Sequence, residues 1–173
     1  MKFFKNLLVA FAFISVFCGC RKGKIVSSVE KENLFELNYG TFEDELNVFN
    51  MSSAGNINTS ISMQDGFFYI LNGESKKIME MNSYGDLLAL YYNPQENPRP
   101  SFSENASDIN STRTAVPYSF NEVSKIAVDS RKYLYAVDKL PLNRQETDPK
   151  TNQVLSQIIV RFDDSKKYMN YIG

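Results

Sequence analysis

The chain contains the same strand-turn-strand pattern twice, and this repeat limits the possible folds more than any other feature. In its second copy, Lys125–Asp138, the apolar runs Ile126–Val128 and Tyr133–Val137 lie on either side of four polar residues. β-Branched and aromatic residues dominate both runs, and four residues is a usual length for a hairpin loop. The segment is therefore predicted to form an antiparallel β-hairpin.

The first copy begins at Ile61, and both copies continue through four short apolar runs separated by turn residues. Corresponding runs, first copy before second, are Ile61–Met63 and Ile126–Val128, Phe68–Asn72 and Leu134–Asp138, Ile78–Asn82 and Ile159–Asp163, and Asp86–Tyr91 and Lys167–Ile172. Short alternating runs joined by tight turns are typical of antiparallel strands. Each copy therefore predicts one four-stranded, up-and-down sheet.

The repeated unit resembles a blade of an NHL-type β-propeller. The match is carried by Ile126–Asp129, Tyr135–Asp138 and Ile159–Asp163, which follow the family's pattern of apolar-Ala-Val-Asp, Tyr-Val-Ala-Asp and Ile-x-x-Phe-Asp. Gln64 and Asn72 of the first copy depart from that pattern, because Asp is usual at both positions. The resemblance implies an all-β, propeller-like fold with two four-stranded antiparallel blades, at about 61–92 and 125–173.

A closed propeller needs roughly four to eight blades, and the repeat supplies fewer. Leu34–Gly40 is similar to Tyr168–Gly173, the outermost strand of a blade, so we expect an orphan N-terminal strand at 34–40. Residues 34–173 would then be a partial propeller, a truncated member of the family that lacks its C-terminal blades. An incomplete propeller exposes an apolar face at either end, which predicts self-association. Thr41–Asn50 fits an edge strand or a short helical turn.

Residues 1–19 are predicted to be a lipoprotein signal peptide. After a basic start, the apolar run Leu7–Phe17 is shorter than the about 20 residues that a membrane-spanning helix needs. Phe17–Cys20 resembles a bacterial lipobox, in which a small residue, here Gly19, precedes the cysteine that receives the lipid. We therefore expect Cys20 to carry the palmitate-type anchor. The alternative is an ordinary secretory signal with two incidental cysteines.

A lipidated Cys20 implies a location in the bacterial cell envelope, with residues 20–33 as a polar membrane tether. The basic residues Arg21, Lys22 and Lys24 follow the anchor, where they either contact anionic headgroups or simply keep the tether solvated. Together with the lipobox, several later segments resemble a family of spirochaete lipoproteins with NHL-like repeats. These segments are Asn82–Leu88, the proline-rich insert after Tyr92, and Val116-Pro117 followed by Val128–Lys132.

Composition argues against several classes of function. Basic and acidic residues number 19 and 20, and a nucleic-acid surface would need a marked basic excess. The chain has no histidine, which excludes Ser-His-Asp triads, Cys-His pairs and imidazole metal ligands. Asp129, Asp138, Asp163 and Asp164 lie at strand ends, where Asp caps turns, and no Asp-x-Asp-x-Asp-Gly calcium loop is present. We therefore expect no catalytic residue, metal site or cofactor.

Two long polar loops are the predicted recognition surface. Asn93–Ser124 and Lys139–Ser156 carry Arg99, Arg113 and Arg144. Binding residues are found disproportionately on loops held by a rigid scaffold, and arginine is enriched at interface hot spots. These three arginines are therefore candidate contacts for a protein or peptide partner. The alternative is that both loops are variable and merely solvated.

The sequence as a whole favours a membrane-anchored lipoprotein that binds or scaffolds partners through a rigid propeller-type platform, rather than an enzyme. Two alternatives stay open. One is a propeller-type lyase or hydrolase whose active-site blades are missing. The other is a truncated product without function.

Overall fold

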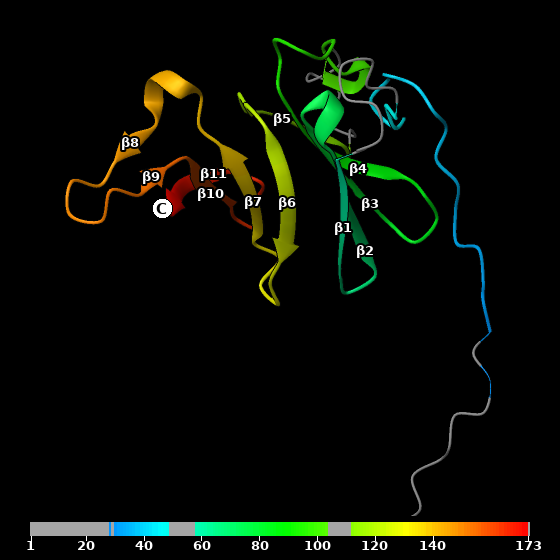
Figure 1. Cartoon of the computed structure of the whole chain (residues 1–173). Helices are drawn as coiled ribbons and strands as arrows, with labels where there is room; N and C mark the ends of the chain where they lie inside the picture. Colours follow the sequence, from blue (N-terminus) through cyan, green and yellow to red (C-terminus); the bar gives the residue numbers. More distant parts are fainter. Residues whose placement is uncertain (1–27, 29, 49–57, 104–111, 173) are drawn as a thin grey trace, which may run out of the picture. The chain divides into compact units, whose positions relative to one another are not determined.

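The computed structural model describes residues 28, 30–48, 58–103 and 112–172 (Figure 1). The chain divides into two compact units, Met1–Glu32 and Asn33–Gly173, and the described strands all belong to the second. The predicted signal peptide, Cys20 and most of the 20–33 tether lie outside the described residues. Within the described ranges the fold is all-β, without α-helices. No helix in this part of the chain has the length and apolar character needed to cross a membrane.

The first sheet has the strand order β1-β2-β3-β4-β5 (Figure 1). Its strands are β1 (Thr59–Gln64), β2 (Phe67–Asn72), β3 (Lys77–Met81), β4 (Leu87–Tyr92) and β5 (Thr114–Pro117). Strands β1 to β4 are antiparallel to their neighbours, as the first copy of the repeat predicts. Strand β5 adds a parallel pairing with β4. Its residues lie inside the loop Asn93–Ser124, where no strand is predicted.

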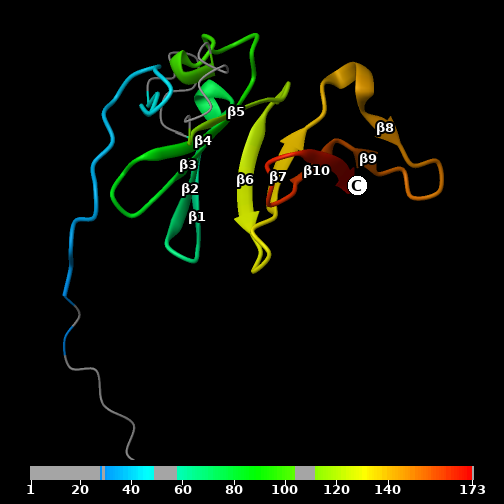
Figure 2. The same ribbon diagram turned by 180° about the vertical axis from the view of Figure 1, so that it is seen from behind.

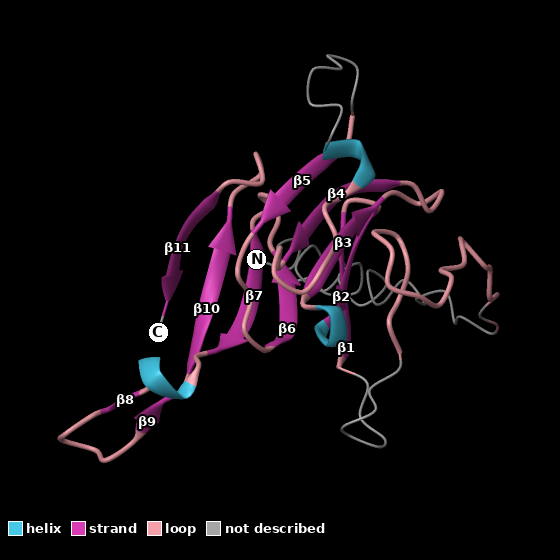
Figure 3. Ribbon diagram, turned by 90° about the horizontal axis from the view of Figure 1, so that it is seen from above, coloured by secondary structure: helices cyan, strands magenta, loops and turns pink. Residues whose placement is uncertain are grey.

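The second sheet has the order β11-β10-β7-β6 and is antiparallel throughout (Figure 3). Its strands are β6 (Val123–Val128), β7 (Leu134–Lys139), β10 (Gln157–Phe162) and β11 (Tyr168–Ile172). The predicted hairpin at Lys125–Asp138 is confirmed by the pairing of β6 with β7. The excursion after β7 contains a small sheet of β8 (Glu146–Thr147) and β9 (Val154–Leu155), which extends away from β10 (Figure 2). Short 3-10 turns occur at η1 (Gly73–Ser75), η2 (Ser101–Ser103) and η3 (Leu142–Arg144).

The two sheets pack face to face around one hydrophobic core. Strands β7 and β10 alternate between buried and less buried residues, so each buries one face. Strand β3 is buried at every position, because the first sheet is covered on both faces. The buried residues between the sheets are Tyr69, Leu71, Ile78, Ala89 and Tyr91 from the first sheet, Val123, Leu134, Ala136, Ile158, Val160 and Phe162 from the second, and Phe120 from the connection.

The N-terminal segment 33–48 covers the other face of the first sheet instead of joining a sheet as a strand. Leu34–Gly40 has only an isolated bridge, between Tyr39 and Leu46, so the predicted orphan strand is wrong. Phe35 instead meets Phe68 edge-on, with the ring centroids 5.5 Å apart. The alternating apolar residues of the segment thus resemble a strand, but they pack onto a sheet face.

This covering segment closes one of the two faces that were expected to be open. Leu37, Leu46 and Phe102 pack, with Phe35, against a cluster formed by Ile70, Met79, Met81, Leu87, Leu90 and Tyr92. Residues 41–45 form a turn, in which the Glu45 N–H donates to the Phe42 carbonyl at 3.2 Å, rather than an edge strand. The expectation of an apolar face at either end is therefore wrong for the first sheet.

The outer face of the second sheet is open within the described structure. All five residues of its edge strand β11 are exposed. Ile159 of β10 lies opposite Ile172 of β11 and is 37% exposed. Since the paired residues point to the same side of the sheet, they form an uncovered apolar patch. The outer face of the second sheet is therefore an exposed apolar surface of the kind from which self-association is predicted.

Candidate functional site

The two long loops converge at the end of the sheets where β4 and β7 finish. A cavity of about 250 Å³ lies between them. Its lining includes Gln95, Glu96 and Tyr118–Asn121 from the first loop, and Leu140, Pro141 and Arg144 from the second. The loops are separated in sequence by the β6–β7 hairpin. Their meeting therefore depends on the packing of the two sheets.

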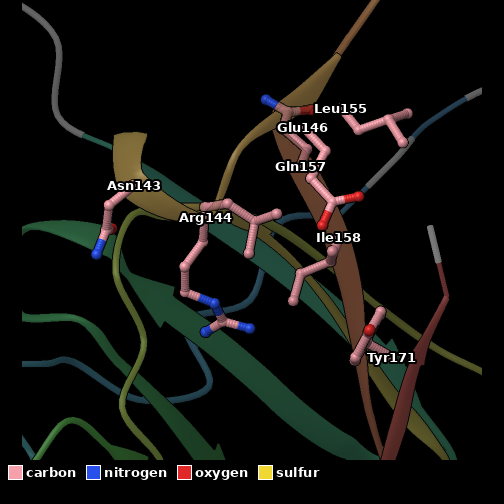
Figure 4. Close-up of a pocket in the computed structure, with 8 residues that line it drawn as sticks. Asn143, Arg144, Glu146, Leu155, Gln157, Ile158 and Tyr171 are labelled. Carbon is pink, nitrogen blue, oxygen red and sulfur yellow. The ribbon is translucent and has the colours of Figure 1, made fainter. Parts of the chain in front are cut away.

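A neighbouring cavity of about 370 Å³ shares Leu140, Arg144 and Ile158 with the first. We call the two cavities together the loop cleft. The additional residues of the larger cavity are Asn143, Glu146, Leu155, Gln157 and Tyr171 (Figure 4). Leu140 and Ile158 give both parts an apolar wall, while the amides and the arginine supply hydrogen-bonding groups.

Arg144 occupies the centre of the loop cleft as the last residue of η3. Its backbone N–H donates to the carbonyl of Pro141 at 2.8 Å, which fixes the turn. Figure 4 shows the side chain extending into the cavity across from Tyr171. Within the described part of the chain, the guanidinium makes no ion pair or side-chain hydrogen bond. Its donors are therefore available to a ligand.

The carboxylate of Asp138 holds the wall of the loop cleft in place. Asp138 is buried, and it accepts hydrogen bonds from the backbone N–H groups of Asn121 at 3.1 Å and Glu122 at 2.8 Å. Burial raises the pKa of this carboxyl above its ordinary value, although the two backbone bonds oppose the rise. Because its oxygens are occupied by the loop, Asp138 acts as a structural anchor.

Several other groups at the loop cleft are neutralised or hydrogen-bonded. Lys76 and Glu96 form an ion pair at 2.7 Å beside the smaller cavity. Burial raises the pKa of Tyr118 to about 12, and the nearby charge of Arg144 opposes that rise. Asn93 donates its side-chain N–H to the carbonyl of Phe120 at 2.7 Å, which ties the end of β4 to the loop. Arg144 makes no ion pair among the described residues, although the Glu146 carboxylate also lines the larger cavity.

Only one of the three predicted arginines lines the loop cleft. Arg99 is exposed in the segment after β4, and Arg113 is exposed directly before β5. Neither is among the residues that line the two cavities. Ile158 of β10 was not singled out from the sequence, and Tyr171 of β11 was interpreted as a core residue rather than as a stacking surface. The two-residue period of those strands was the available signal, because it sets which side chains face inward.

The arrangement is suited to binding. An unpaired guanidinium recognises carboxylates through paired hydrogen bonds, and the apolar wall can bury a neighbouring side chain. Within the residues that the structure describes, no three His, Cys, Asp or Glu side chains gather as a potential metal site. No protein-family model matches the chain, and no curated protein matches it either. Its function is therefore argued from its own geometry.

Proposed function

We propose that the protein is a lipid-anchored binding module in which propeller-type blades hold the loop cleft, and that this cleft receives a peptide segment of a protein partner. The observation that carries the proposal is the convergence of both long loops on Arg144, a cation that has no partner within the described residues. A rigid scaffold presenting such loops is a common arrangement of binding proteins.

The pairing of the sheets supports a propeller-like arrangement. Successive up-and-down sheets packed face to face are the building principle of a propeller, and the two described sheets pack in this way. Their first strands, β1 and β6, lie side by side (Figure 1). The Asn58 side chain donates to the carbonyl of Val123 at 2.9 Å, and the Val128 N–H donates to Ser62 Oγ at 3.2 Å. In a propeller, the first strands of neighbouring blades adjoin the central axis.

The chemistry of the loop cleft defines the partner. Arg144 pairs with a carboxylate, while Leu140 and Ile158 receive an apolar side chain next to it. Asn143 and Gln157 supply amide groups that hydrogen-bond a peptide backbone. The ligand is thus a peptide segment with an acidic residue, or a terminal carboxylate, beside an apolar residue. Lipidation at Cys20 would hold the module in the bacterial cell envelope and restrict its partners to that compartment.

A photocrosslinking experiment tests this assignment. A crosslinking amino acid is placed at Asn143, inside the loop cleft, and in a matched variant at Lys150, an exposed position of the same excursion that does not line the cleft. Crosslinking is performed in cells, and the captured chains are identified by mass spectrometry. We expect the Asn143 probe to capture a defined protein and Arg144→Glu to abolish its capture. Lys150→Glu should leave capture unchanged.

Shortening the excursion after β7 provides a second test of the loop cleft. The N–H of Leu140 donates to the carbonyl of Ser156 at 2.7 Å, so the two ends of the excursion are adjacent and a tight turn can bridge them. For this test the crosslinking amino acid is placed at Gln95, which lines the cleft from the other loop. Replacement of 141–155 by a tight turn should preserve folding and remove the capture seen with this probe in the full-length protein. Undiminished capture by the folded, shortened protein would exclude the loop cleft as the binding surface.

A further inference from the structure

Three strand-connecting turns share one backbone geometry. In each, an Asn or Asp side chain accepts the backbone N–H four residues later, and the residue three positions later has a positive φ. The pairs are Asn82 and Gly85, Asp129 and Lys132, and Asp163 and Lys166, with φ values of 85°, 62° and 66° at the second member. Glycine adopts this conformation freely, whereas lysine does not. Two turns of the second sheet thus hold a lysine where the first sheet has glycine.

Both of these lysines line the same cavity. It has a volume of about 260 Å³ and includes Lys132, Lys166, Glu80, Tyr91, Thr114 and Phe67 in its lining. We call it the turn cavity. The loop cleft adjoins the residues after β7, whereas Lys132 precedes β7, so the two sites lie at opposite ends of that strand. Unfavourable backbone conformations persist where the surrounding structure or a function requires them.

The ion pair with Glu80 uses only part of the hydrogen-bonding capacity of the Lys166 ammonium group. Its Nζ lies 3.3 Å from the carboxylate of Glu80, which is longer than a usual charge-assisted bond. An ammonium group has three donors. Lys166 therefore keeps donors that are free for a molecule in the turn cavity.

Lys132 has no counter-ion in the described part of the chain. Its Nζ lies 4.4 Å from the centroid of the Phe67 ring, a cation–π contact that holds the side chain at the edge of the turn cavity. The neighbouring Asp129 is already paired with Arg131 at 3.1 Å. The position of the Lys132 ammonium is thus defined, while its charge is not neutralised by a protein carboxylate.

We propose that the turn cavity binds a small ligand through an oxyanion, a carboxylate or phosphate group, held between the ammonium groups of Lys132 and Lys166, with the Thr114 hydroxyl as a further donor. The site is separate from the loop cleft and does not rest on the function proposed for it. Asp164, which also lines the turn cavity, carries the opposite charge and limits the affinity. Its neutralisation should therefore strengthen binding.

Titration of the isotope-labelled full chain, followed by NMR of backbone amides, tests the proposal with inorganic phosphate and with succinate as probes. We expect saturable shifts at the two turns 129–133 and 163–167 with at least one probe. The tighter probe distinguishes a phosphate from a carboxylate ligand. Absence of saturable shifts at both turns with both probes would overturn the proposal.

Charge-neutral variants define the contribution of each group. Lys132→Met retains the apolar contact with Phe67 and should weaken binding about tenfold, the loss expected for one charge-assisted hydrogen bond. Asp164→Asn should strengthen it. Because Lys166→Met leaves Glu80 buried and unpaired, that position is tested in the double variant Glu80→Gln/Lys166→Met, which should also bind weakly.

Lys167→Met is the matched control, since Lys167 lies in the same turn but not in the lining of the turn cavity. It should leave the affinity within about twofold, as expected of an exposed, screened charge. If Lys167→Met weakens binding as much as Lys132→Met, the anion is attracted by general surface charge and the proposed site is wrong.

Discussion

The ammonium group of Lys166 lies 3.3 Å from the carboxylate of Glu80, although the two residues are 86 positions apart in the chain. Glu80 belongs to β3 of the first sheet, and Lys166 to the turn between β10 and β11 of the second. The side chain of Glu80 is only 7% exposed. This ion pair therefore joins the sheets at a place where a lone carboxylate would be poorly solvated.

Removal of Lys166 alone should lower the stability of the protein more than removal of both Lys166 and Glu80. Lys166→Met is expected to lower the free energy of unfolding by about 3 kcal/mol, because Glu80 then remains buried and unpaired. In Glu80→Gln/Lys166→Met much of that loss should be recovered. Urea unfolding of the single and double variants measures the coupling. Independent, additive losses would contradict a direct interaction.

Because Lys77 is buried, the free energy of unfolding should increase as the pH becomes alkaline. Burial lowers its pKa to about 8, although the acidic segment Glu43–Glu45 opposes the shift. Its ammonium donates to the carbonyl of Phe42. Between pH 8 and the ordinary pKa of 10.5 the unfolded chain binds a proton that the folded chain lacks. The contribution of Lys77 to stability therefore rises with pH in this window.

Comparison with Lys77→Met isolates this contribution. From pH 7 to 9.5, the free energy of unfolding of the wild type should rise relative to that of the variant by about 2 kcal/mol. Urea unfolding at several pH values is the measurement. Lys139→Met, which removes a lysine whose side chain is 44% exposed, is measured in the same way for comparison. A constant difference between wild type and Lys77→Met would show that Lys77 has an ordinary pKa.

Asp138 should determine the order of the loop-cleft wall. Asp138→Ala removes the acceptor for the N–H groups of Asn121 and Glu122. We expect a loss of about 1–3 kcal/mol, the cost of leaving buried donors unpaired, together with faster hydrogen exchange at both amides. Asp138→Asn keeps one acceptor oxygen and should retain most of the protection. Equal exchange in all three proteins would exclude Asp138 as the anchor.

Cys20 should be the site of lipidation. Cys20→Ser is expected to abolish incorporation of labelled palmitate and to move the protein from the membrane to the soluble fraction. Cys18→Ser is the matched control and should still be labelled, because the small residue Gly19 precedes Cys20 and not Cys18. Continued labelling of Cys20→Ser would refute the assignment.

The open face of the second sheet should promote self-association. We expect the molecular mass of the delipidated protein to rise with concentration in analytical ultracentrifugation. Ile159→Lys places a charge on the open face and should shift the protein towards the monomer. Ile61→Lys, at an exposed position of β1, should have a smaller effect. A wild-type monomer at every concentration would argue against association through this face.

The strands of the repeat could be predicted because their alternation and turn residues are local properties. Leu34–Gly40 has the same alternation, but its side chains cover a sheet face, and a local pattern does not distinguish the two outcomes. The parallel strand β5 was missed because its partner, β4, is set by the path of a long loop. Its four residues also end in a proline, which weakens the strand signal.

The candidate sites were harder to predict from the sequence than the strands, because they depend on long-range packing. Arg99, Arg113 and Arg144 share a residue type and a loop location, and only the approach of the two loops separates Arg144 from the others. Lys132 and Lys166 lay in turns that were recognised as turns. Their match with Gly85 was present in the sequence, but the cavity between them exists only because the two sheets pack together.

Phe35, Leu37, Leu46 and Phe102 cover the first sheet, so the two outer faces of the fold differ. One side is finished, since a further sheet could stack there only after the segment 33–48 was displaced. Among the described residues nothing covers the other side, formed by the second sheet, so an additional layer could pack there without displacing any of them. Growth of this architecture, whether by gene duplication, by protein design or by docking of another copy, therefore proceeds in one direction, beyond the second sheet.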